Sequence, residues 1–135
     1  MIQRIQTLFL IIAALLDLSV FFTALYERAI EDPSVFISYG FAILVTLAML
    51  TSVGLIFLYN NRQKQISGVK YLLLLQVLAL GFGVGITFSL GGIGTYLWDE
   101  AIGDLLLVLA LVFQYLALTY IKKDEELVKS MDRIR

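Results

Sequence analysis

The sequence predicts an all-α integral membrane protein whose four transmembrane helices form an up-and-down antiparallel bundle. The first observation is composition, because 60% of the 135 residues are hydrophobic and only 16% are charged. Soluble domains are nearer 45–50% apolar and about 25% charged. The second observation is four long apolar runs, and the third is a strong segregation of basic residues to one side of these runs. A bilayer supplies the apolar surroundings that so small a chain cannot provide for itself.

Each apolar run is long enough to cross a hydrocarbon core of roughly 30 Å, which takes roughly 20 residues of helix. We expect spans at about 5–26, 35–59, 67–91 and 102–121. Residues 1–121 then make a transmembrane domain, and residues 122–135 make a charged, short amphipathic C-terminal helix. Because the connections are short, consecutive spans are expected to be antiparallel neighbours.

Local signals mark the expected helix ends. Asp32 is the predicted N-cap of the second span, with Pro33 in its first turn, and Asp99 is the predicted N-cap of the fourth span. The first run follows Arg4 and resembles a signal peptide, but it is longer than a signal-peptide core. No small-residue cleavage motif follows it, so it is expected to remain as a helix.

The basic residues predict the orientation in the membrane. Nine of the ten Lys and Arg residues fall on one side of the predicted topology, and only Arg28 falls on the other. Most acids outside the C-terminal segment lie on the side of Arg28. Because basic loops remain in the cytoplasm, both termini and the connection near Arg62 are expected to be cytoplasmic.

Asp17 lies within the apolar stretch "LLDLSVFF" of the first span. From the helical rise it is placed roughly 18 Å below the cytoplasmic edge, beyond the midplane. The same arithmetic puts Gln76 roughly 14 Å, Gln114 roughly 12 Å and Thr46 roughly 15 Å from that edge. The four residues therefore predict an intramembrane polar cluster in which Asp17 contacts Gln76 and Gln114. A carboxyl at this depth must carry a proton or find hydrogen-bond donors on neighbouring helices.

Two interpretations of this cluster remain open. Polar side chains can hold helices in register, each contributing about 0.6–2 kcal/mol. Alternatively, an ionisable residue inside the membrane can be a proton or ion site. Asp104 and Lys70 lie near opposite span ends and make no obvious relay with Asp17.

Two short motifs, GxxxG and S-x-x-K, also occur in the sequence. Gly81 and Gly85 form a GxxxG pattern that permits close helix packing, within the bundle or between two copies. Ser67 and Lys70 match S-x-x-K, but the companion motifs of Ser–Lys enzymes are missing.

The C-terminal segment carries an apolar stripe on a charged helix, formed by Leu127, Met131 and Ile134. Either it lies along the membrane or on its own bundle, or it docks a cytoplasmic protein. The residues expected to make cytoplasmic contacts are Arg4, Lys122, Lys123, Glu125, Leu127, Met131 and Ile134.

The two ends of the sequence, "MIQRIQTLFLIIAA" and "IKKDEELVKSMDRIR", resemble a bacterial membrane protein family, the domain-of-unknown-function family numbered 4293. The resemblance covers the whole chain, with hydropathy alone matching in the middle. It implies four spans, a charged C-terminal tail and a bacterial cytoplasmic (inner) membrane. The family brings no catalytic or binding residue with it.

The sequence has no Cys and no His, which excludes disulfides, thiolate metal sites and Ser–His or Cys–His nucleophiles. We expect no cofactor, no metal ligand and no catalytic residue. The leading hypothesis is a non-enzymatic accessory or scaffold subunit in contact with the lipid bilayer and with either a protein partner or further copies of itself, and not with nucleic acid. The alternative is a small proton- or ion-coupled transporter that uses Asp17. A lipid-modifying enzyme built on the acids Asp99, Glu100 and Asp104 is the weakest of the three hypotheses.

Overall fold

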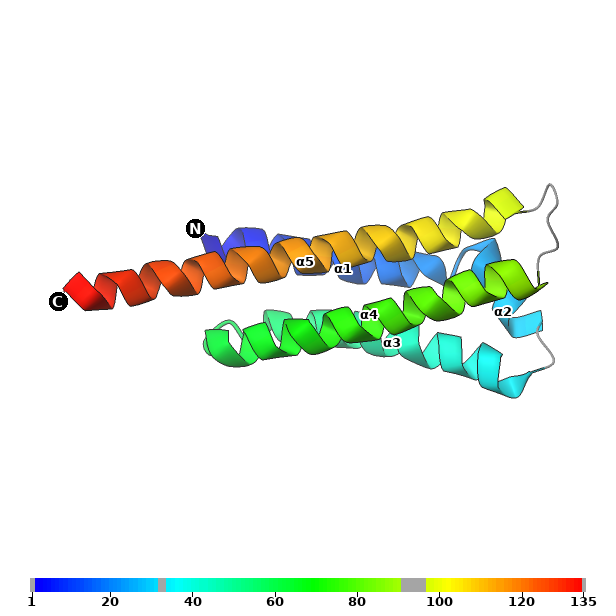
Figure 1. Ribbon diagram of the computed structural model, residues 1–135, viewed down its shortest axis with the longest axis horizontal. Helices are drawn as coiled ribbons and strands as arrows, with labels where there is room; N and C mark the ends of the chain where they lie inside the picture. Colours follow the sequence, from blue (N-terminus) through cyan, green and yellow to red (C-terminus); the bar gives the residue numbers. More distant parts are fainter. Residues whose placement is uncertain (1, 32–33, 91–96, 135) are drawn as a thin grey trace.

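A computed structural model of the chain describes residues 2–31, 34–90 and 97–134, with side chains in 5–31, 34–88 and 98–134. Within these ranges every regular element is a helix (Figure 1). The five helices are α1 (Ile2–Val20), α2 (Ala24–Glu31), α3 (Val35–Ile56), α4 (Arg62–Leu90) and α5 (Leu97–Ile134).

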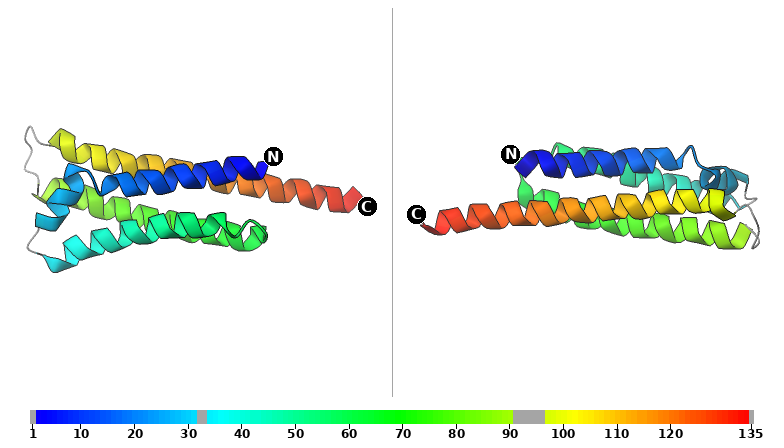
Figure 2. Two further views of the ribbon diagram at one scale, coloured as in Figure 1. Left: turned by 180° about the vertical axis from the view of Figure 1, so that it is seen from behind. Right: turned by 90° about the horizontal axis from the view of Figure 1, so that it is seen from above.

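The four long helices pack side by side, and each contacts two of the others. Helix α1 packs on α3 and α5, and α4 packs on the same two helices from the opposite side (Figures 1 and 2). Their directions alternate along the chain. The start of α1, the α3–α4 connection and the end of α5 therefore lie together, at what we name the termini end (Figure 1). The short helix α2 lies at the opposite end, the α2 end.

The first predicted span is not one continuous helix. Helix α1 ends at Val20, and after a break of three residues α2 continues at an angle of 51° to it. Tight backbone bonds form the break, from Phe21, Phe22 and Thr23 to the carbonyls three residues earlier. The hydroxyl of Thr23 also donates to the Val20 carbonyl, at 2.6 Å. Such side-chain bonds compete with the helical backbone ladder, which favours a bend here.

Three helices, α3, α4 and α5, are long and apolar enough to cross a membrane, and the bent pair α1–α2 brings the number to four if it counts as one span. Asp32 and Pro33, expected to start the second span, lie outside the described residues. Helix α3 has Ser34 as its N-cap.

Helix α4 begins at Arg62, five residues earlier than predicted. The side chain of Asn61 accepts a hydrogen bond from the Lys64 backbone N–H at 3.2 Å. Asparagine is among the best N-cap residues, so the short polar connection initiates the helix instead of delaying it.

Helix α5 corrects two predictions. It begins at Leu97, so Asp99 lies inside its first turn and is not the N-cap. It also continues without interruption to Ile134, so residues 122–134 are the last turns of α5 and not a separate tail helix. The helix projects beyond the rest of the molecule at the termini end (Figures 1 and 2). Strong helix formers such as Lys, Glu and Leu fill the junction, and no Gly or Pro interrupts it.

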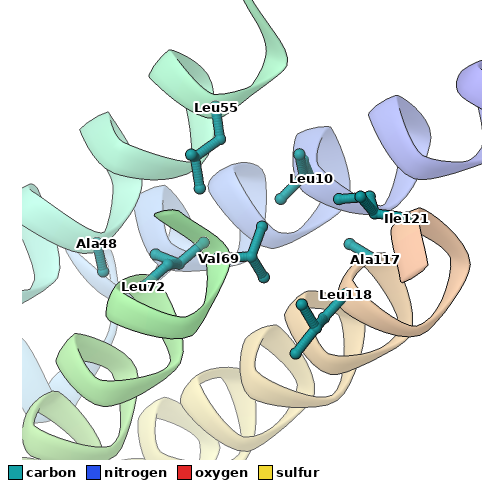
Figure 3. Packing of buried hydrophobic residues seen from close by; sticks show 8 residues of the cluster. All are labelled: Leu10, Ala48, Leu55, Val69, Leu72, Ala117, Leu118 and Ile121. Atoms are coloured by element: carbon teal, nitrogen blue, oxygen red, sulfur yellow. The ribbon is translucent and has the colours of Figure 1, made fainter. Parts of the chain in front are cut away.

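The buried apolar residues form two clusters, one in each half of the molecule. The cluster near the termini end draws side chains from all four long helices, which point toward one another (Figure 3). Its members are Leu10, Ala48, Leu55, Val69, Leu72, Ala117, Leu118 and Ile121. The cluster near the α2 end comprises Val20, Leu25, Ala29, Phe41, Val45, Ala79, Ile86 and Leu107.

The prediction that Gly81 and Gly85 pack helices within the bundle is wrong. Both are exposed, and a Cβ atom added to either would meet nothing within 4 Å. Three other glycines do allow close packing: Gly83 and Gly103, which are both buried, and the half-buried Gly68, which lies against the Leu55 side chain. A Cβ on Gly103 would lie 2.5 Å from the Cβ of Leu25, so this glycine lets α2 lie directly against α5.

Substitution of Gly103 by Ala is therefore expected to destabilise the protein by about 1–3 kcal/mol, since the Cβ of Leu25 cannot move unless α2 moves. The matched control is Gly81→Ala, which makes the same chemical change in open space and should be neutral or stabilising by up to about 1 kcal/mol. The free energy of unfolding in mixed micelles measures both. Equal losses in the two variants would contradict the packing of α2 described above.

Candidate functional site

A buried chain of three polar side chains connects α1, α4 and α5. The Gln76 Nε2 amide donates to Asp17 Oδ1 at 2.9 Å and to the Leu107 carbonyl at 3.3 Å. The Gln114 Nε2 amide donates to Gln76 Oε1 at 2.9 Å. The contact predicted among Asp17, Gln76 and Gln114 is thus present, and we name these three residues the polar layer.

All three side chains are fully buried. Two oxygens, Asp17 Oδ2 and Gln114 Oε1, have no hydrogen-bond partner among the described residues. A buried acceptor without a partner costs roughly 1–3 kcal/mol. The polar layer therefore keeps two oxygens without a hydrogen-bond partner among the described residues, between two apolar clusters, and one of these oxygens belongs to an ionisable group.

The polar layer separates the two apolar clusters. On α4, Gln76 lies between Leu72 of one cluster and Ala79 of the other. Gln114 likewise lies between Ala117 and Leu107 on α5. The hydrogen bonds thus form at one level of the bundle, where a shift of α1, α4 or α5 along its axis would break them.

Thr46 was predicted to belong to the same cluster, but its hydroxyl donates to the Ala42 carbonyl on its own helix at 2.7 Å. A threonine in a helix readily makes this local bond. The hydrogen bonds of the polar layer described above involve α1, α4 and α5 and do not reach Thr46.

Charged residues hold α2 against α5 at the α2 end. Arg28 Nε lies 3.0 Å from Glu100 Oε1, and Glu100 is only 2% exposed. Arg28 also lies 4.0 Å from Glu31. A cavity of about 300 Å³ opens here, and its wall includes Glu27, Arg28, Asp99 and Glu100.

Asp104 lies one helical turn below Glu100 on the same face of α5. Its Oδ2 is 2.8 Å from the Thr87 hydroxyl of α4. Its Oδ1 is buried without a hydrogen-bond partner in the described part of the chain, and a Cβ on Gly83 would lie 2.5 Å from it. Asp104 therefore fills the space that Gly83 leaves open. We name Glu100 and Asp104 together the acidic line.

Glu100 and Asp104 were considered only as acids of a lipid-modifying enzyme, together with Asp99, and their burial on one face of α5 was not predicted, although the sequence holds a signal for it. Glu100, Asp104, Leu107 and Gln114 recur at helical spacings of three, four and seven residues, which places them on one face of α5. Because Gln114 is predicted to point into the bundle, the carboxyl groups of Glu100 and Asp104 on the same face of the helix are expected to point inward as well.

The cytoplasmic contact residues predicted in the C-terminal segment lie on the projecting part of α5. Leu127, Met131 and Ile134 are all exposed, and Ile134 reaches 86%. The ion pair between Arg62 and Asp124, at 3.1 Å, joins the start of α4 to the base of this projection.

The other residues predicted to make cytoplasmic contacts are Arg4, Lys122, Lys123 and Glu125. Glu125 pairs with Lys129 at 3.3 Å. The Lys123 ammonium lies 5.5 Å from the centre of the Tyr120 ring, and Lys122 is exposed. The side chain of Arg4 lies outside the described side chains.

The described residues contain no group of three or more acids placed to hold a metal ion. Cavities open at both ends of the molecule, including one of about 450 Å³ beside Arg62 and Lys129 at the termini end. Asp17 is not among the residues that line these two cavities. The side chains of the polar layer can donate and accept hydrogen bonds, and the Asp17 carboxyl can take up or release a proton.

A double-mutant cycle tests the polar layer. Asp17→Leu and Gln76→Leu are expected to show a coupling of about 0.6–2 kcal/mol in the free energy of unfolding, because each change removes one partner of the Asp17–Gln76 hydrogen bond. Thr46→Val should change stability by less than about 0.5 kcal/mol, since it removes only a bond within one helix. Additive effects of the first two changes would mean that the Asp17–Gln76 bond contributes nothing to stability.

The comparisons with known proteins give a single match, to a family model. No curated protein and no solved structure matches the chain significantly. The match covers α3, α4 and α5, including Gln76, Glu100, Asp104 and Gln114, and it begins beyond Asp17. By this match over residues 31–134, which is well over half of the sequence, the chain belongs to the family described as a domain of unknown function, DUF4293.

Proposed function

We propose that the protein is an integral membrane protein in which α3, α4, α5 and the bent pair α1–α2 cross the bilayer. The observation that carries this proposal is the inverted distribution of side chains. The polar layer is buried, while large apolar side chains are exposed on the outer faces of all four long helices. Examples are Leu15 on α1, Leu50 on α3, Leu74 on α4 and Leu105 on α5.

Soluble proteins rarely expose apolar patches larger than a few hundred Å². In lipid the same surface is favourable, and the backbone of each helix already satisfies its own hydrogen bonds. We further place the termini end in the cytoplasm, because it carries most of the basic residues. The membrane expected from the family resemblance is a bacterial cytoplasmic membrane.

Because the chain has no cysteine, single introduced cysteines test this orientation. Ser130→Cys should react with a membrane-impermeant thiol reagent only from the cytoplasmic side, and Glu27→Cys only from the opposite side. Both positions are exposed, so lack of access cannot explain protection. Labelling of both cysteines from the same side would contradict the proposed topology, and the cysteine-free parent protein is the control.

We propose further that the protein is a non-enzymatic accessory or scaffold subunit that binds a cytoplasmic protein through the projecting part of α5. A helix of 38 residues is about 57 Å long, which exceeds the roughly 40–45 Å of a bilayer with its headgroups. The charged residues that begin at Lys122 therefore favour a position outside the membrane. We name the exposed side chains Leu127, Met131 and Ile134 the tail stripe.

The tail stripe has the spacing by which an amphipathic helix docks into an apolar groove. It projects past the other helices, so a partner can reach it without touching the bilayer (Figure 2). The Arg62–Asp124 ion pair and the Glu125–Lys129 pair support the helix at its base. This combination of a fixed base and an exposed apolar stripe is what supports the subunit hypothesis.

Native purification tests the subunit hypothesis. The full chain, tagged between residues 92 and 98, is extracted in mild detergent, and co-purifying proteins are identified by mass spectrometry. Leu127→Glu and Met131→Glu are expected to weaken recovery of a stoichiometric partner by at least about tenfold, because each places a charge in an apolar contact.

Arg133→Glu is the matched control, because it introduces the same side chain at an exposed position of the helix away from the tail stripe and leaves the Glu125–Lys129 pair intact. Retention of the partner by all three variants would contradict a role for the tail stripe. A homo-oligomer with no second protein would contradict the subunit hypothesis itself.

A second candidate function is proton-coupled transport centred on Asp17. The observation that favours it is the unpartnered Oδ2 of this fully buried carboxyl, within the described residues. Ionisable groups in such positions commonly mark proton or ion sites. The test is proton flux into liposomes that contain the protein, which Asp17→Asn should abolish.

A further inference from the structure

Three carboxyl groups follow one another from the α2 end into the interior. The first is Glu100, in the wall of the cavity that opens between α2 and α5. Its Oε1 pairs with Arg28, while its buried Oε2 has no hydrogen-bond partner in the ranges that the structure describes. An oxygen of an almost fully buried acid is thus left available beside a cavity that solvent can enter.

The second carboxyl, Asp104, lies roughly 6 Å deeper, at one turn of α5. The Thr87 hydroxyl lies 2.8 Å from Asp104 Oδ2 and 3.1 Å from the Gly83 carbonyl. A hydroxyl has only one hydrogen to donate. When Thr87 donates to Gly83, the hydrogen in the other contact must belong to Asp104. The same positions of the heavy atoms therefore suit Asp104 with or without a proton.

The third carboxyl is Asp17 in the polar layer, and Leu107 connects the two levels. The Leu107 carbonyl accepts a hydrogen bond from the Gln76 amide that also binds Asp17. A Cβ on Gly83 would lie 3.1 Å from Leu107 Cδ1 and 2.5 Å from Asp104 Oδ1. Asp104 and the polar layer are thus separated by a single residue of α5.

Helix α2 covers this series of acids. Leu25 packs where Gly83 and Gly103 leave room, and Arg28 binds Glu100. The break at Phe21–Thr23 begins one helical turn after Asp17. The element that closes the acidic line is therefore joined to the helix that carries Asp17 by a short non-helical segment.

We propose that Glu100 and Asp104 form a proton-access path between the solution at the α2 end and Asp17. A proton leaves an oxygen of one carboxyl, passes through water that enters from the cavity, and joins an oxygen of the next carboxyl; each water gives up one proton as it takes another, so no group is consumed. This proposal rests on the proposed membrane insertion. It supplies the proton-coupled transport proposed above with a route between Asp17 and the solution at the α2 end. It does not depend on the tail stripe.

Few other titratable groups face this path. In the half of the molecule near the α2 end, α3 contributes Tyr39, and the described part of α4 contributes no charged side chain. The charged and titratable groups of the surrounding elements, besides the three acids themselves, are Tyr26, Glu27, Arg28, Glu31, Tyr39 and Asp99.

The experiment measures how the protonation of Asp17 responds to pH on each side of the membrane. Dicyclohexylcarbodiimide enters lipid and reacts with protonated carboxyl groups, and peptide mass spectrometry locates the modified residue. The full chain is reconstituted in vesicles of known orientation, with Ser130→Cys reporting that orientation. The rate of modification at Asp17 is then followed while pH is changed on one side only.

We expect the rate of modification at Asp17 to fall as pH rises on the side of the α2 end, because fewer Asp17 carboxyls then carry a proton. The rate should not change with pH on the other side. Asp104→Asn, which retains an oxygen for Thr87, should remove this response. Asp104→Glu should restore it, because a carboxyl is present again. Asp132→Asn, an exposed change on the projecting part of α5, should behave as the parent protein does.

Several results would overturn the path. These are a response to pH only from the termini end, a response unchanged in Asp104→Asn, or a rate at Asp17 that follows sodium concentration at constant pH. Proton flux measured on the same vesicles separates the two proposals. A response at Asp17 without flux would support the path and contradict proton-coupled transport.

Discussion

The hydrogen bonds of Gln76 set the positions of α1, α4 and α5 along their axes relative to one another. The apolar side chains on either side of the polar layer are mostly Leu, Ala and Val, which pack almost equally well in several registers. A shift of one turn would leave Asp17 against hydrocarbon with no donor, and an unpaired buried acid is costly. The polar layer thus selects one arrangement among many that the apolar residues would accept, which is a role known for single polar residues in coiled coils.

The two halves of the molecule, on either side of the polar layer, differ in the polar groups that they contain. Toward the α2 end, the helices enclose Asp104 and Glu100 beneath a short helix that is held by one arginine and two glycines. Toward the termini end, the buried side chains of Ser52 and Gln65 donate to the backbone carbonyls of Ala48 and Leu55, and ion pairs join Arg62 to Asp124 and Lys129 to Glu125. The proposed exchange with solution thus lies at the α2 end, and the proposed contact with a protein lies at the termini end.

Much of this organisation could be predicted from the sequence, because the helical rise is constant and the polar residues are few. Depth along each span was enough to bring Asp17, Gln76 and Gln114 together. The face of α4 that points inward was harder to predict. This helix is apolar on nearly every face, so its sequence pattern does not distinguish the buried side. Gln76 supplies the missing marker, because seven residues later on the same face lies Gly83. Gly81 and Gly85 are two residues away from it, on the other side of the helix.

The bend after Val20 and the early start of α4 were missed for a related reason. Average hydropathy is uniform across residues 5–26, whereas the break depends on single hydroxyl and backbone hydrogen bonds. The start of α4 depends on one asparagine side chain. Single hydrogen bonds such as these depend on local geometry. The average hydropathy over a window of residues carries no information about that geometry.

Helix α5 carries the tail stripe at one end and the acidic line at the other, with no interruption between them. An uninterrupted helix behaves as a stiff rod over this length, so a turn about its axis cannot be absorbed in the middle. Torque applied by a cytoplasmic partner at Met131 would reach Asp104 and Glu100, where it acts on the contacts with Thr87 and Arg28. Under the proposed topology, binding of a partner at the tail stripe would thus be coupled mechanically to the acidic line at the opposite end of the same helix.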